Sequence, residues 1–338
     1  MTNDLMSIFT GKKVLITGGT GSLGQALTKR ILNSDVEQIR ILSRNEFKQI
    51  SMETKLPDER LRFLIGDVRD KDRLIRALDD VDIVFHAAAL KHVPKVEYNP
   101  FEAIKTNVQG SQNVIDACLE NDVQKAICIG TDKAVSPLNT YGATKLLMEK
   151  LFITAKRYSN PKKHPTKFLA VRYGNVFGSS GSVIPKFIEQ INNNKKITIT
   201  DPTMTRFSIT MNQALDFILK ATQKGHGAEV FIPKLKAYSL QQIHDILSNL
   251  TNAKDHEIIG MRTGEKQHEL LINSDEMRYA WSYDNMFVLL NELHESENLE
   301  EVYPGIKKIE DLDVYSSAKT QQLSTEEITE NIKDLQLL

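Results

Sequence analysis

Short apolar runs alternate with longer amphipathic segments through the first half of the chain. The runs predict strands over residues 14–16, 39–42, 61–65, 81–85, 126–129 and 168–171. The segments between them repeat apolar residues every three or four positions and predict helices over 25–32, 70–78, 100–120 and 141–157. Strands that alternate with helices are typical of an α/β fold, in which a doubly wound parallel sheet is covered by helices on both faces.

The pattern changes after residue 175, where glycine and proline residues interrupt the chain. A helix over 211–224, a strand over 229–232 and a helix over 240–250 follow. We therefore predict a sheet domain over residues 1–175, which the strand near 229–232 rejoins. Residues 176–338 are predicted to form a smaller C-terminal α/β lobe over the strand ends.

The composition excludes several classes of protein. The 43 basic and 44 acidic residues leave a net charge of −1, whereas binding nucleic acid through its phosphates requires a basic surplus. Cys118 and Cys128 lie in apolar stretches without metal-site spacing, which predicts buried free thiols in a reducing compartment and no metal. The N-terminus lacks an apolar leader, and no segment approaches the ~18 apolar residues of a membrane span. We expect a cytoplasmic protein that binds neither nucleic acid nor membrane.

A glycine-rich turn connects the first predicted strand to the first predicted helix. Glycine allows a tight turn and lets the backbone approach a pyrophosphate, which the N-terminus of the following helix stabilises. A glycine pattern also fits a plain turn, but its place between strand and helix favours the dinucleotide site of a Rossmann sheet. The residues predicted to bind there are Gly18, Thr20, Gly21, Ser22, Leu23 and Gly24.

The end of the second predicted strand indicates which dinucleotide binds. NAD sites usually place an acidic residue there, which binds the ribose hydroxyls. Here Ser43 and Arg44 follow the strand, with Lys48 one helical turn later, and cations attract the 2′-phosphate of NADP. We therefore predict NADP; the alternative is that these are solvated basic residues on a loop. The other predicted cofactor contacts follow the third and fourth strands: Asp67, Val68, Ala87 and Ala88.

Tyr141 and Lys145 lie four positions apart on a predicted helix, so their side chains share one face. Thr131 follows the fifth predicted strand. A tyrosine hydroxyl has a pKa of about 10, and lowering it by about three units costs about 4 kcal/mol. One ammonium about 4 Å away supplies about 4 kcal/mol at an effective dielectric near 20. Most tyrosine–lysine pairs of this spacing are surface residues. Because this pair occurs together with an upstream glycine turn and Thr131, we predict that it is catalytic and that Lys145 lowers the pKa of Tyr141.

Several further segments indicate which protein family the chain resembles. They are residues 86–94 (HAAALKHVP), 131–134 (TDKA), 139–145 (NTYGATK), 172–176 (RYGNV), 204–207 (MTRF) and 262–266 (RTGEK). With the glycine turn, they make the whole chain resemble the extended short-chain dehydrogenase/reductase family. Within that family, the chain is similar to the UDP-N-acetylglucosamine 4,6-dehydratases, in particular to the inverting enzymes that open pseudaminic acid synthesis. Ser180 departs from the family pattern, because relatives commonly carry arginine there.

The resemblance implies bound NADP, a UDP-N-acetylglucosamine substrate and a closed redox cycle. Carbon 4 is oxidised, water leaves from carbons 5 and 6, hydride returns to carbon 6, and carbon 5 is reprotonated from the opposite face. By the same resemblance, Thr131 and Tyr141 act on the carbon-4 hydroxyl, while Lys145 holds the ribose. Asp132 protonates the departing hydroxyl and Lys133 is the base at carbon 5. Retaining relatives carry Asp-Glu at the position of this Asp-Lys pair.

A lysine base must be neutral when it acts, and burial or nearby cations lower a lysine pKa. The candidate cations that would lower the pKa of Lys133 are Lys91, Lys145 and oxidised nicotinamide; the alternative is an ion pair between Lys133 and Asp132 or another carboxylate. The arginines implied at the diphosphate and the glutamate implied at the uridine ribose are Arg206, Arg262 and Glu265. The other substrate contacts implied by the resemblance are Lys91, Tyr173 and Asn175.

Three other functions share part of this pattern. A UDP-N-acetylglucosamine 4-epimerase needs Thr131, Tyr141 and Lys145 but no acid–base pair. A plain reductase of a small ketone consumes external NADPH. A non-enzymatic NADP-sensing module keeps the glycine turn but commonly loses the tyrosine–lysine pair.

Family analogy also implies a homo-oligomer, either a dimer or a hexamer. Extended members often pair through the helices predicted here over 100–120 and 141–157. The second helix offers Leu147, Leu151 and Phe152 for such packing.

Overall fold

The computed structural model describes residues 5–158, 160, 163–179, 182–251, 255–290, 292–294 and 298–335. Within these residues, the largest sheet has ten strands in the order β16-β14-β15-β10-β6-β5-β4-β1-β2-β3. Their bounds are β1 Lys13–Thr17, β2 Gln38–Ser43, β3 Leu61–Ile65, β4 Ile83–His86, β5 Lys125–Ile129, β6 Lys167–Val171, β10 Val230–Pro233, β14 Ala280–Tyr283, β15 Met286–Leu289 and β16 Lys307–Lys308. The part of this sheet with the order β10-β6-β5-β4-β1-β2-β3 is parallel throughout. The direction of the strand order reverses between β1 and β4. The prediction of a doubly wound α/β sheet is confirmed.

Helices cover both faces of the sheet because its strands are apolar on both sides. In β1, Val14 and Ile16 pack into one apolar cluster and Leu15 into the other. The helices on the first face are α2 Ser22–Ile31, α3 Glu46–Lys55 and α10 Met211–Lys224. Those on the second face are α4 Lys71–Leu78, α7 Gly110–Glu120 and α8 Thr140–Tyr158. Full burial of each such side chain contributes roughly 1.5–3 kcal/mol, so the layers hold one another in place.

The predicted helix over 100–120 consists of three consecutive segments. They are α6 Pro100–Ala103, a π-helical stretch Ile104–Gln109, and α7. In the π-helical stretch, the side chain of Asn107 accepts from the Leu90 amide at 2.8 Å and donates to the Leu90 carbonyl at 3.0 Å. The π-helical stretch thus holds the loop after β4 in place through Asn107. Hydrophobic periodicity in the sequence does not reveal this contact.

The sequence pattern did not indicate α3 or α5 Val93–Tyr98. In α3 only Gln49 and Met52 are buried, so the helix has little apolar periodicity to detect. Its first turn is instead specified by Asn45, whose side chain accepts from the Lys48 amide at 2.9 Å.

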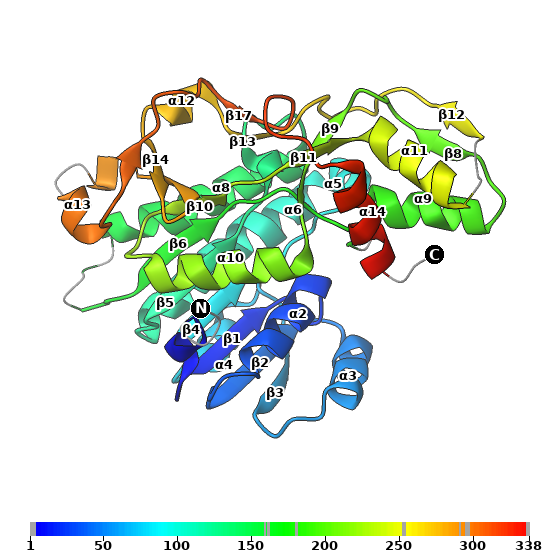
Figure 1. The fold of residues 1–338 in the computed structure, drawn as a ribbon. Coiled ribbons are helices and arrows are strands. Elements are labelled where there is room, and N and C mark those ends of the chain that lie inside the picture. The colour runs from blue at the N-terminus through cyan, green and yellow to red at the C-terminus, as the bar shows by residue number, and fades with distance from the viewer. Residues whose placement is uncertain are drawn as a thin grey trace.

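The C-terminal half extends the sheet and also forms a second apolar core. β15, β14 and β16 continue the sheet in antiparallel fashion beyond β10. The second core lies between α9 Val183–Asn192, α11 Leu240–Thr251 and α14 Thr325–Asp334 (Figure 1). The remaining strands are β7 Asn175–Val176, β8 Ile197–Ile199, β9 Thr205–Ile209, β11 Ala237–Ser239, β12 His256–Ile258, β13 Leu270–Ile272 and β17 Tyr315–Ser316. The remaining short helices are Ser7–Phe9, Asp132–Ala134, α12 Ser274–Met277, Glu292–His294 and α13 Leu299–Val302. The division at residue 175 stays a prediction.

Arg172 joins the parallel sheet to the C-terminal half. Its fully buried guanidinium lies 2.6 Å from Glu149 of α8 and 2.9 Å from Glu276 of α12. Although burial lowers the pKa of Arg172, these carboxylates raise it on balance. Because removing one partner of a buried pair typically costs about 3–5 kcal/mol, this cluster fixes how the two parts meet.

Cys118 and Cys128 are free and buried, as predicted. Burial raises the pKa of Cys128 to about 12. No helix in the described residues is long and apolar enough to cross a membrane.

Candidate functional site

A cavity of about 1110 Å³ lies at the carboxyl edge of the parallel strands. Its wall contains residues that follow β1, β2, β3, β4, β5 and β6, and it extends to the segment around Arg262. In open α/β sheets, ligands bind at this edge, where the strand order reverses. The volume exceeds the roughly 300–1,000 Å³ of ordinary small-molecule sites, so the cavity is large enough for more than one ligand.

The glycine turn forms one end of the cavity. Gly18 has φ of 66°, and a Cβ atom there would lie 2.9 Å from the Ala88 backbone. Helix α2 begins at Ser22, three residues before the predicted start, because the extended Gly21 ends the turn. No side chain caps its first turn, so the backbone N–H groups beside the cavity are available to an anion. The turn therefore fits the pyrophosphate of a dinucleotide, and all six residues predicted there line the cavity.

Two basic side chains lie where the dinucleotide ribose is expected. Arg44 and Lys48 both line the cavity, and Arg44 Nη1 lies 3.7 Å from Asp67 Oδ2. Burial raises the pKa of Asp67, but hydrogen bonds from Arg69 lower it on balance. Asp67 is therefore an ion-paired carboxylate. Ser43 also lines the cavity, and its hydroxyl accepts from Gln49 at 3.0 Å.

The loop after β4 is fastened by a chain of hydrogen bonds through His86. The Ala88 amide donates to Thr17 Oγ1 at 3.2 Å, and Thr17 Oγ1 lies 2.7 Å from His86 Nδ1. On the other side, His86 Nε2 lies 3.0 Å from Ser111 Oγ, which donates to the Asn107 carbonyl. Ser111 Oγ must therefore accept from Nε2–H, which assigns Nδ1 as the acceptor from Thr17. Burial lowers the pKa of His86 to about 3, so this histidine is neutral and structural.

Tyr141 and Lys145 both line the cavity from α8, but they do not interact as predicted. Lys145 Nζ donates to the Ile129 carbonyl at 2.6 Å, and burial lowers the pKa of Lys145. Burial raises the pKa of Tyr141, while the charge of Lys133 and a hydrogen bond with Thr131 oppose that rise. The expectation that Lys145 lowers the pKa of Tyr141 is wrong for this structure, in which the opposing cation is Lys133.

Lys133 lies among hydrogen-bond acceptors. Its Nζ is 3.1 Å from Asp132 Oδ1, 3.1 Å from Asn175 Oδ1 and 3.5 Å from Glu269 Oε1. Burial lowers the pKa of Lys133, but the two carboxylates raise it on balance. The expectation that nearby cations lower this pKa is therefore wrong, and the alternative of an ion pair is confirmed.

Asp132 is fully buried behind the cavity wall. Its Oδ1 accepts from Thr131 Oγ1 at 2.9 Å, whereas its Oδ2 has no hydrogen-bond partner among the described residues. Burial, aided by the charge of Glu269, raises the pKa of Asp132 against the effect of Lys133. A raised carboxyl pKa is suited to general acid catalysis.

Most of the other predicted ligand contacts also line the cavity. They are Val68, Ala87, Ala88, Lys91, Tyr173, Asn175, Arg262 and Glu265. Arg262 Nη1 lies 3.5 Å from Glu265 Oε1. Arg206 is absent from the described cavity wall; its guanidinium donates to the carbonyls of Thr205 at 2.7 Å and Gln267 at 3.1 Å. Ser180 lies outside the described residues.

Glu269 and Lys266 are the polar residues near Lys133 that sequence reasoning missed. Lys266 follows Glu265 in the RTGEK segment, but no spacing connects either residue to Lys133. Only the packing of the C-terminal half against the sheet brings them together. No group of three or more His, Cys, Asp or Glu side chains in the described residues is arranged to hold a metal ion.

Comparison with known proteins identifies the family of this chain. Residues 14–291 match the family described as polysaccharide biosynthesis protein. The Campylobacter jejuni UDP-N-acetylglucosamine 4,6-dehydratase (inverting) is 48% identical over 285 residues, which are 83% of this chain and 84% of the relative. A Rickettsia bellii protein named UDP-glucose 4-epimerase is 42% identical over 97% of both chains.

Solved structures agree on the fold. Pen from Bacillus thuringiensis is 38% identical, with a TM-score of 0.89 that covers 98% of this chain and 99% of that one. DesIV from Streptomyces venezuelae, a dTDP-glucose 4,6-dehydratase solved with NAD, has a TM-score of 0.72 at 17% identity and covers 95% and 96% of the two chains. These two structures therefore share the fold of this chain over almost its whole length.

Proposed function

Because this chain belongs to the polysaccharide biosynthesis protein family, within the extended short-chain dehydrogenases/reductases, we propose that it is an NADP-dependent lyase acting on UDP-N-acetylglucosamine. The proposed reaction is 4,6-dehydration with inversion at carbon 5. Its product is UDP-2-acetamido-2,6-dideoxy-β-L-arabino-hex-4-ulose. The name of the Campylobacter relative supports this reaction.

The observation that carries the proposal is the Asp132–Lys133 pair beside Tyr141. The two side chains lie 3.1 Å apart, and Lys133 lines the same cavity as Tyr141. Dehydration needs an acid for the departing hydroxyl and a base for the carbon-5 proton. Epimerisation at carbon 4 needs neither, so a buried acid–base pair favours dehydration.

The cofactor is proposed to lie between the glycine turn and Lys145, with its 2′-phosphate beside Arg44 and Lys48. When bound, it supplies the acceptor and donor of hydride. Cations at the end of β2, with Asp67 already ion-paired to arginines, favour NADP over NAD.

Tyr141 Oη is proposed to take the proton of the carbon-4 hydroxyl, with Thr131 hydrogen-bonded beside it. This step needs the phenolate. The charge of Lys133 favours the phenolate, because it lowers the pKa of Tyr141 against the effect of burial.

The Asp132–Lys133 ion pair can become an acid and a base by one proton transfer along its 3.1 Å hydrogen bond. The transfer from Lys133 Nζ to Asp132 Oδ1 leaves a neutral amine and a carboxylic acid. Lys133 then takes the carbon-5 proton as Asp132 protonates the carbon-6 hydroxyl, and water leaves. The pair returns to its original charges, so no proton is gained or lost. General acid–base catalysis of this kind typically contributes about 100- to 10,000-fold.

The test is incubation with UDP-N-acetylglucosamine in deuterium oxide, followed by NMR and mass spectrometry. We expect a 4-keto product that has lost one water, carries deuterium at carbon 5 and has inverted configuration there. Lys133→Met should suppress deuterium uptake while the protein still releases NADP on denaturation. The control is Lys125→Met, which removes a lysine that binds the carbonyl of Thr222 at 2.7 Å outside the cavity wall.

Other outcomes separate the alternatives. A product of unchanged mass indicates a 4-epimerase, the activity named for the Rickettsia relative. Consumption of external NADPH indicates a reductase. A protein that leaves the sugar unaltered, or retains no pyridine nucleotide, contradicts the proposal.

A further inference from the structure

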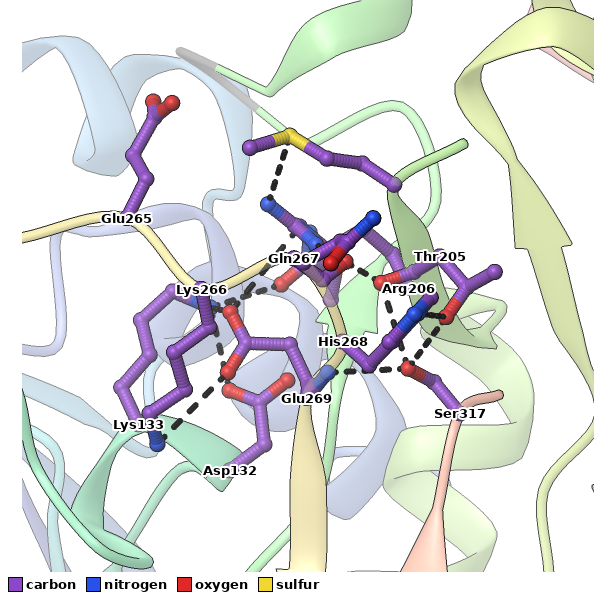
Figure 2. A network of polar contacts seen from close by, with 12 residues as sticks. Asp132, Lys133, Thr205, Arg206, Glu265, Lys266, Gln267, His268, Glu269 and Ser317 are labelled. Atoms are coloured by element: carbon purple, nitrogen blue, oxygen red, sulfur yellow. Dashed lines mark hydrogen bonds and ion pairs between the residues drawn. The ribbon is translucent and has the colours of Figure 1, made fainter. Parts of the chain in front are cut away.

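Glu269 lies at the centre of a charged network behind Lys133 (Figure 2). It immediately precedes β13, and its carboxylate is buried. Glu269 Oε1 lies 3.5 Å from Lys133 Nζ and 3.9 Å from Arg206 Nε, while Oε2 lies 4.0 Å from Lys266 Nζ. The Glu269 amide donates to Ser317 Oγ at 2.9 Å, which holds the backbone in place.

We propose that Glu269 is a positioning residue, which holds Lys133 beside Asp132 and sets the pH range in which this acid–base pair works. The inference rests on the proposed function. It assigns a role to a residue that does not itself line the cavity but contacts Lys133, which does.

The geometry supports a role through Lys133 rather than through the ligands. Among the residues that the structure describes, Lys133 Nζ has two charged neighbours within 4 Å, Asp132 and Glu269, and one neutral acceptor, Asn175. Without Glu269, the Lys133 ammonium would have Asp132, its proton acceptor, as its one nearby carboxylate. With Glu269 present, the ammonium lies between two carboxylates. Removing Glu269 would leave Arg206 and Lys266 without this shared counter-charge.

The groups that face the pair come from several elements. Asp132 and Lys133 belong to one short helix, Tyr141 to α8, Arg206 to β9, Tyr238 to β11, and Lys266 and Glu269 to the segment before β13. With both carboxylates ionised, three cations face two anions. Loss of Glu269 therefore makes the surroundings more positive, and loss of Lys266 makes them more negative.

Glu269 and Lys266 carry opposite charges, so removing them should shift the pH profile in opposite directions. A more positive environment promotes loss of a proton from both Asp132 and Lys133. Glu269→Gln should therefore move both limbs of the pH profile of kcat to lower pH, by about one unit or more for a charge this close. Lys266→Met should move both limbs to higher pH. Glu269→Asp, which keeps the charge, should restore most of the wild-type profile.

The matched control is Glu265→Gln. Glu265 points away from the network in Figure 2 and pairs with Arg262 on the cavity wall. Its loss should raise KM for the UDP-sugar without moving either limb. A purely structural contribution of Glu269 would lower kcat at every pH and leave the limbs where they are.

The outcomes keep the two proposals distinguishable. If the wild-type protein removes no water from UDP-N-acetylglucosamine, the proposed function fails. If the wild type makes the product but the Glu269→Gln limbs do not move, the role of Glu269 is wrong. Circular dichroism and the content of bound nucleotide show whether each variant folds. If Glu269→Gln does not fold, Lys266→Met provides the test. A pH profile of Lys266→Met that stays in place or moves to lower pH overturns the inference.

Discussion

Gly18 satisfies two requirements that no other amino acid meets together. Its backbone has φ of 66°, and the space where a Cβ would stand is occupied by the Ala88 backbone 2.9 Å away. The same close approach brings the turn after β1 against the loop after β4. The site therefore depends on the absence of a side chain at this residue.

Gly18→Ala can be compared with Gly11→Ala, because Gly11 has a similar φ of 64° but no atom within 4 Å of the added Cβ. We expect Gly11→Ala to lower the free energy of unfolding by about 1–2 kcal/mol, the cost of the left-handed conformation. Gly18→Ala should lower the free energy of unfolding by about 1–3 kcal/mol more than Gly11→Ala, because the added Cβ overpacks against Ala88. The Gly18→Ala protein should also retain less nucleotide. Denaturant unfolding and nucleotide content measure both. Equal losses in the two variants would show that the contact with Ala88 is unimportant.

At the scale of elements, His86 connects β1, β4 and α7 through Thr17 and Ser111. The ring also stacks on Phe152 of α8, with centroids 5.7 Å apart and planes 6° apart. Residue type and spacing alone do not distinguish a ligand-binding histidine at position 86 from a structural one. Two assigned hydrogen bonds and complete burial identify it as structural.

The buried, neutral His86 makes stability depend on pH. Its folded-state pKa of about 3 lies below the ordinary value of 6.5, so the unfolded chain binds a proton more readily. The stability that His86 contributes is therefore complete above pH 6.5 and is lost as the pH falls from 6.5 towards 3. The loss amounts to as much as about 1.4 kcal/mol per pH unit.

His86→Gln, which keeps one donor and one acceptor, should remove this pH dependence. Its free energy of unfolding should be lower than that of the wild type at neutral pH and should fall less steeply below pH 6.5. Urea unfolding at a series of pH values measures the two slopes. Parallel slopes would contradict the assignment of a neutral His86 in the folded state.

At the scale of the whole molecule, the packing of α6 against α8 leaves apolar side chains at the surface. Phe101 is 63% exposed and Leu147 is 50% exposed. Phe152, which we expected at a subunit interface, is instead fully buried against His86. We propose that the chain forms a homo-oligomer through these helices, with Phe101 and Leu147 rather than Phe152 at the contact.

Phe101→Glu combined with Leu147→Glu should convert the oligomer to a monomer, because each substitution places a charge in an apolar contact. Light scattering after size-exclusion chromatography measures the mass. Leu312→Glu, at a residue that is 39% exposed elsewhere, should leave the assembly unchanged. A wild-type protein that is monomeric at high concentration would contradict the proposal.

Local pattern and spacing were sufficient for much of the fold and for one side of the site. The parallel strands, the glycine turn and the shared helix of Tyr141 and Lys145 follow from residues that are close in the sequence. The direction of side chains along one strand or helix is a local property, so the spacing of residues in the sequence predicts it.

The protonation states of the proposed catalytic groups depend on contacts that only the tertiary structure supplies. A pKa depends on charges within a few ångströms, and several of those charges come from segments far apart in the chain. Asp132, the preceding residue, and Glu269, which packs behind Lys133 from the C-terminal half, together raise the pKa of Lys133. Arg206 binds backbone carbonyls beside that network instead of lining the cavity. Residue types and spacing specify which groups are available, but packing of the C-terminal half against the sheet determines which of them meet and with what charge.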